Sequence, residues 1–100
     1  MSNFVLSLFA DRDLEELLEY GVATHGTLQA VRYHDELMRA FETISAFPQI
    51  AREHTEFGSP VRVHHHGRHY IIYQARKDDV FILRIIRDET DLSHYLRTLA

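Results

Sequence analysis

The chain has 100 residues, of which 45% are apolar and 26% charged, with a formal net charge of −4 and no cysteine. This composition excludes a disordered segment, because it supplies enough apolar side chains for a core, and the length fits one domain over residues 1–100. The acidic total argues against broad nucleic-acid binding, which requires many Lys and Arg contacts to phosphate, and without cysteine no disulfide can form.

The first half of the chain predicts one strand followed by two helices. The apolar, aromatic-rich run at residues 4–9 predicts a strand, and Asp11 is expected to cap the helix that follows. A second helical pattern covers residues 28–47 and is expected to end at Pro48. Because the link between the two helices is short, we expect a helical hairpin.

The second half predicts three strands, at residues 61–66, 69–76 and 80–87, after an irregular segment at residues 49–60. Gly67-Arg68 fits a two-residue hairpin loop of type II′, since glycine comes first. Asp91 can cap a last helix, whose apolar face would hold Leu92, Tyr95, Leu96 and Leu99. The element order β-α-α-β-β-β-α predicts an α+β fold in which the helical hairpin packs on a small antiparallel sheet.

The two-residue loop fixes which side chains share a face, because side chains alternate along a strand. One face of the first hairpin then carries ionisable residues: Arg62, His64, His66, His69 and Tyr73. The other face, with Val61, Val63, Tyr70 and Ile72, is expected to be the core side. The polar face fits either a functional surface or the solvated side of an antiparallel sheet.

The register of the third strand has two solutions. A two-residue loop at Asp78-Asp79 places Arg84 beside Tyr73, whereas a three-residue loop places Arg87 on that face instead. The sequence does not choose between them.

His64, His66 and His69 raise the hypothesis of a zinc site, although three His without Cys make an incomplete set and an exposed His-rich hairpin is favoured. The chain has no phosphate-binding loop and no serine in a nucleophile motif. No cofactor or metal is therefore expected.

The N-terminal segment lacks the basic leader of a signal peptide, and no apolar run approaches the roughly 20 residues that span a bilayer. We therefore expect a cytoplasmic protein without a membrane partner.

The order and spacing of residues along almost the whole chain resemble those of ParE toxins, in the RelE/ParE superfamily of toxin–antitoxin modules. In the helical half these residues are Leu6, Ser7, Ala10, Asp13, Leu14, Glu16, Leu17, Tyr20, Gly26, Gln29, Ala30, Tyr33, Leu37, Phe41, Ile44 and Pro48. In the strand half they are Arg62, Gly67, His69, Ile72, Tyr73, residues 82–86, Asp91 and Leu96.

This resemblance implies a toxin that acts by binding another protein, with DNA gyrase as the target, and that forms a hetero-oligomer with a ParD-like antitoxin. The residues assigned to antitoxin binding are Leu14, Leu17, Leu18, Tyr20, Tyr33, Leu37 and Phe41. The residues assigned to target binding are Arg84, Arg87 and Tyr95.

Two alternatives stay open. RelE-type relatives cut messenger RNA on the ribosome, and such an activity here would use Arg62, His69, Tyr73, Arg84 or Arg87. The two acidic residues in the stretch 87–90 disfavour this activity, since they would repel RNA phosphate. A degenerate family member that only binds its antitoxin is the second alternative.

Overall fold

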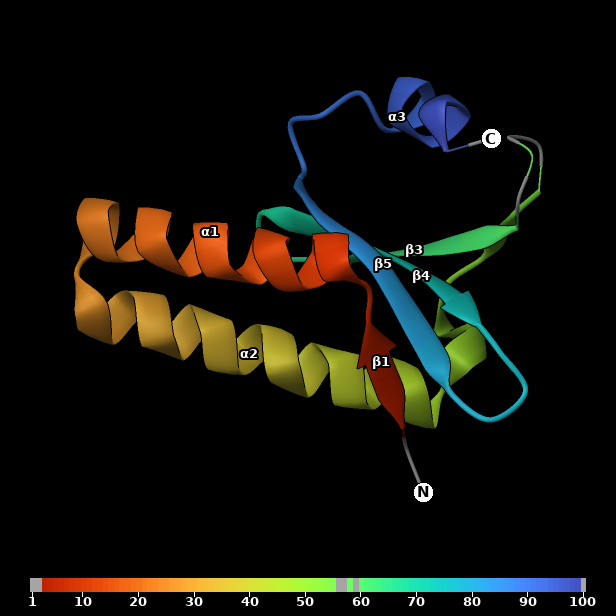
Figure 1. The fold of residues 1–100 in the computed structure, drawn as a ribbon, viewed down its shortest axis with the longest axis horizontal. Coiled ribbons are helices and arrows are strands. Elements are labelled where there is room, and N and C mark those ends of the chain that lie inside the picture. Colours follow the sequence, from red (N-terminus) through yellow and green to blue (C-terminus); the bar gives the residue numbers. More distant parts are fainter. Residues whose placement is uncertain (1–2, 56–57, 59, 100) are drawn as a thin grey trace.

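The computed structural model describes residues 3–55, 58 and 60–99, and the predicted α+β architecture is confirmed (Figure 1). The helices are α1 (Leu8–His25), α2 (Thr27–Ala46), a 3₁₀ turn η1 (Pro48–Ile50) and α3 (Leu92–Thr98). The strands are β1 (Phe4–Leu6), β2 (Glu53–His54), β3 (Val61–His66), β4 (His69–Ala75) and β5 (Val80–Arg87). They form one sheet in the order β1-β5-β4-β3-β2, antiparallel except for the parallel pair β1 and β5.

The chain's first elements correct the expected strand at residues 4–9. The strand ends at Leu6 and α1 begins at Leu8, so the cap is Ser7 rather than Asp11. The Ser7 hydroxyl accepts the Ala10 N–H at 2.9 Å and donates to the Leu83 carbonyl at 2.7 Å. One side chain therefore satisfies a free helix N–H and a carbonyl of β5, which explains why the helix starts so early.

The hairpin of β3 and β4 has the predicted register. Arg62 pairs with Tyr73 and His66 with His69, across a loop in which Gly67 has a φ of +55°. Arg68 lacks a positive φ, so the torsions agree with the type II′ turn. The segment at residues 49–60, predicted to be irregular, adds the two-residue edge strand β2.

Strand β5 contains a bulge that resolves its register. Near the turn Val80 pairs with Ala75 and Ile82 with Tyr73, but one residue further along Arg84 pairs with Ile72. The extra residue, Leu83, shifts the second part of the strand. Arg84 and Arg87 consequently lie on opposite faces, which is the solution with Arg87 on the His69 side.

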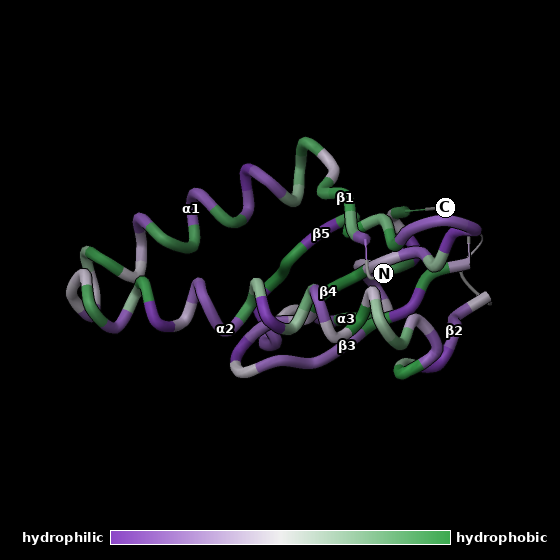
Figure 2. The backbone as a smooth tube through the Cα atoms, turned by 90° about the horizontal axis from the view of Figure 1, so that it is seen from below, coloured by the Kyte–Doolittle hydropathy of each residue, from purple (hydrophilic) through white to green (hydrophobic). Residues whose placement is uncertain are grey.

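Both faces of the sheet are covered, which corrects the assignment of a single core side. The helical hairpin packs on the face that carries Ile71, Tyr73, Ile82 and Ile85. Helix α3 covers the other face, where the buried residues are Val61, Ile72, Ile86 and Leu96. Strands β4 and β5 are mainly hydrophobic whereas β3 is mainly hydrophilic (Figure 2), so the core lies at the centre of the sheet.

The helical hairpin projects beyond the strands at the end where α1 is joined to α2 (Figure 1). The two helices approach closely, since a Cβ added at Gly21 would lie 3.1 Å from the Ala30 Cβ. Within residues 3–55, 58 and 60–99, none of the helices combines the length and apolar character that a bilayer crossing requires.

The Gly67→Ala variant is expected to lose about 2 kcal/mol of unfolding free energy, because φ is positive and the new Cβ would lie 2.7 Å from the Tyr33 hydroxyl. Urea unfolding measures this loss, and Gly58→Ala, which also has a positive φ but lies outside the hairpin, is the matched control. Equal losses in the two variants would show that the Tyr33 contact contributes nothing.

Candidate functional site

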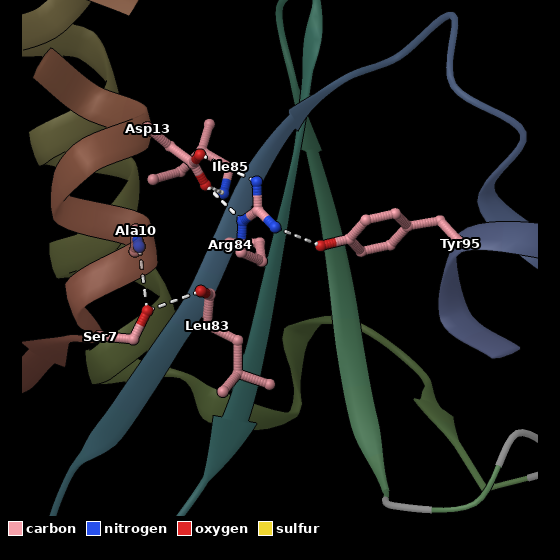
Figure 3. A network of polar contacts seen from close by, with 7 residues as sticks. All are labelled: Ser7, Ala10, Asp13, Leu83, Arg84, Ile85 and Tyr95. Carbon is pink, nitrogen blue, oxygen red and sulfur yellow. Dashed lines mark hydrogen bonds and ion pairs between the residues drawn. The ribbon is translucent and has the colours of Figure 1, made fainter. Parts of the chain in front are cut away.

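Arg84 lies at the centre of a polar cluster that joins α1, β5 and α3 (Figure 3). Its Nε and Nη2 donate to the two carboxylate oxygens of Asp13 at 2.8 and 3.0 Å, and its Nη1 donates to the Tyr95 hydroxyl at 2.9 Å. The Asp13 carboxylate also accepts the Ile85 N–H at 3.0 Å. We call Asp13, Arg84 and Tyr95 the Arg84 cluster.

The cluster completes an edge of the sheet. Strand β1 pairs with β5 only as far as Ile82, so the next polar groups of β5 lack a neighbouring strand. The side chains of Ser7 and Asp13 satisfy the Leu83 carbonyl and the Ile85 N–H instead. The hydrogen bonds with Asp13 raise the pKa of Arg84 above its ordinary value, and the guanidinium stays charged.

Two acidic residues that are close to Arg84 in the sequence, Asp79 and Glu89, pair with other arginines. Asp79 pairs with Arg76, with nitrogen–oxygen distances of 2.6 and 2.7 Å, and Glu89 pairs with Arg87 at 2.8 Å. Arg84 forms its ion pair with Asp13, which is 71 positions away in the sequence. Sequence spacing could not reveal this pair, because α1 reaches β5 only in the folded chain.

A second polar cluster joins α2 to the hairpin of β3 and β4. The Tyr33 hydroxyl lies 2.7 Å from His69 Nδ1, accepts the Arg68 N–H at 3.2 Å and donates to the His66 carbonyl at 3.3 Å. Burial raises the pKa of Tyr33, which stays protonated. These contacts fix the start of β4 against α2.

A cavity of about 680 Å³ lies beside this second cluster, where the projecting hairpin meets the end of the sheet. We call it the corner cavity. The sheet side is lined by Arg68, His69 and Arg87, and the charged residues of the helical side are Asp13, Glu16, Glu36 and the cation Arg32. The sheet wall is therefore cationic, whereas the helical wall carries both signs with more acidic than basic side chains.

An apolar groove lies on another part of the surface, between the start of α1, β5 and α3, with a volume of about 460 Å³. Its apolar residues are Leu8, Phe9, Phe81, Leu83, Tyr95 and Leu99. Leu8 is 84% exposed and Phe9 62% exposed. The sequence prediction missed both, because it placed them in a strand, although Ser7 as an N-cap was the signal that could have revealed their helix.

The family model for the ParE toxin of the parDE type II toxin–antitoxin system matches residues 4–92. The chain belongs to the ParE toxin family. It also resembles the solved structure of a chromosomal ParDE toxin–antitoxin system from P. aeruginosa, with a TM-score of 0.72 and 19% sequence identity. The alignment covers 87% of this chain and 96% of the other, and no match was found among curated protein sequences.

Three of the residues assigned to antitoxin binding lie inside this ParE-family toxin. Leu37 and Phe41 are fully buried and Leu14 is 6% exposed, all in the core between the hairpin and the sheet. Their assignment to the antitoxin surface is corrected, because the inner faces of α1 and α2 pack on the sheet. Of the other assigned residues, Leu17, Leu18 and Tyr33 are half-buried and Tyr20 is exposed.

The residues assigned to RNA cleavage are not gathered in one place. Tyr73 is fully buried and donates to the Pro48 carbonyl at 2.8 Å, while Arg62 donates to the Ala51 carbonyl at 2.6 Å. Arg84 and His69 lie on opposite faces of the sheet. The predicted polar face of β3 and β4 is therefore a partly buried surface under α2 rather than an open reaction surface.

The assigned target-binding residues are also divided. Arg84 and Tyr95 are hydrogen-bonded to each other, whereas Arg87 lies at the corner cavity on the other face.

The histidines considered for a zinc site lie among residues with other contacts. The ring nitrogens of His65 and His66 have separate neighbours, since His65 bonds Asp88 at 3.0 Å and His66 lies 3.9 Å from Glu36. Within the described part of the chain, no three or more His, Asp or Glu side chains form a metal-binding group.

The stability of this ParE-family toxin is expected to fall as the pH is lowered from about 7.5 to about 5.5. Burial lowers the pKa of His64 and His69 in the folded state, so the unfolded chain binds protons first as the pH falls through about 6.5. Above that range both histidines are neutral in the folded and in the unfolded chain, so their contribution to the free energy of unfolding no longer changes with pH.

Urea unfolding at both pH values measures this dependence. Replacing His64 and His69 with Gln should flatten the pH slope, whereas replacing His94, which is exposed on α3, should leave it unchanged. An identical slope in all three proteins would contradict the assignment.

Proposed function

We propose that this toxin arrests growth by binding DNA gyrase in the cytoplasm, and that a ParD-like antitoxin neutralises it in a hetero-oligomeric complex. The match of residues 4–92 to the ParE toxin family supports the toxin role. The antitoxin partner and the preference for protein binding rest on the surface features that follow, and the gyrase target rests on the resemblance to ParE toxins.

The apolar groove is the observation that carries the antitoxin partner. Exposed apolar side chains that gather beside a groove indicate a protein–protein contact, because burying them against a partner removes apolar surface from water. Leu8 and Phe9 form such a pair next to Phe81 and Leu99. A segment of the antitoxin that folds on binding would cover them.

Protein binding is favoured over RNA cleavage. The residues that cleavage would require are buried, as Tyr73 is, or lie on opposite faces, as His69 and Arg84 do. A net charge of −4 also opposes association with an RNA backbone.

The first experiment is induction of this chain in a bacterial host, with growth, gyrase supercoiling and the integrity of messenger RNA measured in the same culture. Arrest with impaired supercoiling and intact RNA is the expected result. Arrest with cleaved RNA would instead support the endoribonuclease, and normal growth with a folded protein would indicate a binding-only member.

The second experiment is co-expression with the small protein encoded beside this chain. We expect the two to co-purify and growth to be restored. The double variant Leu8→Asp/Phe9→Asp should lose co-purification, whereas Phe47→Asp, also exposed at 66%, serves as the matched control. Retention of the complex by the double variant would exclude the apolar groove.

A further inference from the structure

The corner cavity is separate from the apolar groove and has a cationic wall on the sheet side. Arg87 pairs with His69 across β5 and β4, so both side chains lie on the face that the cavity occupies. Arg68 stands in the loop immediately before His69. Two guanidinium groups and an imidazole are thus brought to one end of the sheet.

Arg87 is available to an external anion. Its guanidinium lies over the Tyr20 ring, 5.6 Å from the centroid, which holds it at the mouth of the cavity. Its ion pair with Glu89 is at the surface, where the two side chains are 58% and 67% exposed. Such an exposed pair contributes little and can be exchanged for a carboxylate of a partner.

The neighbouring groups are held in place before any partner arrives. The Tyr33 hydroxyl fixes both His69, at 2.7 Å, and the Arg68 backbone, at 3.2 Å. The approach of Tyr33 to Gly67 leaves no room for a side chain at that position. Because this backbone and the His69 ring are already ordered, less entropy is lost there when an anion binds.

The remaining surfaces of the cavity decide which anion fits. Leu17, Ala30 and Ile85 supply apolar lining, whereas on the helical side Glu16 and Glu36 outnumber the single cation Arg32, and Asp13 is already paired with Arg84. A polyanion such as RNA would meet these two carboxylates, but a single acidic side chain can reach the sheet wall while its apolar neighbour meets the lining.

We propose that the corner cavity binds a segment of the protein partner that directs a carboxylate to Arg87 and Arg68 and an apolar side chain to Leu17 and Ile85. The proposal rests on the proposed function, since the partner is the antitoxin. It adds a second, charge-specific contact on the opposite face of the sheet from α3.

The test measures binding of the full toxin to the purified small protein encoded beside it, by titration calorimetry. Arg87→Gln and Arg68→Gln are each expected to weaken binding about tenfold, because each removes a charge-assisted hydrogen bond. Arg76→Gln, at the other end of β4 with its own ion pair to Asp79, is the matched control and should change binding less than about twofold. Thermal melting confirms that the variants fold.

A double-mutant cycle identifies the carboxylate. Each Asp and Glu of the small protein is neutralised in turn, and one of these changes should weaken binding to the wild-type toxin but not to Arg87→Gln. Unchanged binding by both arginine variants, with tight binding by the wild type, overturns this inference and leaves the proposed function intact. Absence of binding by the wild type overturns both.

A binding assay with a short labelled RNA tests whether the cavity takes phosphate instead of a carboxylate. If the RNA binds the wild type, competes with the small protein and fails to bind Arg87→Gln, the cavity takes phosphate and the carboxylate assignment is wrong. We expect no such competition at physiological salt.

Discussion

The Phe41→Ala variant is expected to lose about 3 to 5 kcal/mol of unfolding free energy. The Phe41 side chain is fully buried, and its ring packs at a tilt of 59° on Phe4, with 5.5 Å between the centroids. Removing it leaves a cavity between α2 and the sheet that the surrounding side chains cannot close. Since small domains have only about 5 to 15 kcal/mol of stability, much of the protein's margin would be lost.

Urea unfolding with an unchanged slope measures this effect, and Tyr20→Ala is its matched control. Tyr20 belongs to the same sequence-derived set of antitoxin contacts but is 57% exposed, so its loss should cost less than about 1 kcal/mol. A Phe41→Ala protein that keeps its stability and loses only antitoxin affinity would show that Phe41 is a surface contact after all.

The Asp13→Asn variant is expected to lose about 2 to 3 kcal/mol, with a melting temperature lower by roughly 10 to 20 °C. The substitution keeps the shape of the side chain, but the amide cannot accept all three hydrogen bonds from Arg84 and Ile85. Arg84 would keep its charge in a partly buried position without a counter-ion, which is the main source of the loss.

Glu15→Gln is the control for Asp13→Asn, since Glu15 is an exposed acid on the same helix. In a double-mutant cycle with Arg84→Gln, the cost of Asp13→Asn should fall by about 1 to 3 kcal/mol. Tyr95→Phe should cost only about 1 kcal/mol, because it removes one hydrogen bond. Equal melting temperatures for Asp13→Asn and Glu15→Gln would contradict a structural role for the Arg84 cluster.

The Arg84 cluster also changes how the resemblance to ParE toxins is interpreted for this residue. Arg84 was assigned to the target surface, but its Nε and Nη2 donate to Asp13 and its Nη1 donates to Tyr95, both within the toxin. Loss of toxicity in an Arg84 variant must therefore be separated from loss of folding. Arg87, at an open cavity, can be replaced with less risk to folding.

The local sequence pattern was sufficient to predict most helices and strands and the register of the hairpin formed by β3 and β4. The apolar spacing at residues 28–47 predicted α2 within one residue at each end, and Asp91 caps α3 as expected, accepting the His94 N–H at 3.2 Å. Glycine at position 67 fixed the loop and thereby every pair between β3 and β4. These features follow from contacts between residues that are close in sequence, so the sequence by itself determined them.

Only the tertiary structure decided which elements and side chains that are distant in the sequence lie side by side. The pattern in β3 and β4 showed correctly which residues share a face, but not that α2 would cover the ionisable face and enclose Tyr73. It could not place Asp13 against Arg84, or select the register that a bulge at Leu83 creates in β5. Each of these depends on the packing of elements far apart in the chain, and such packing has no local signature because it is set by the shapes and charges of whole surfaces.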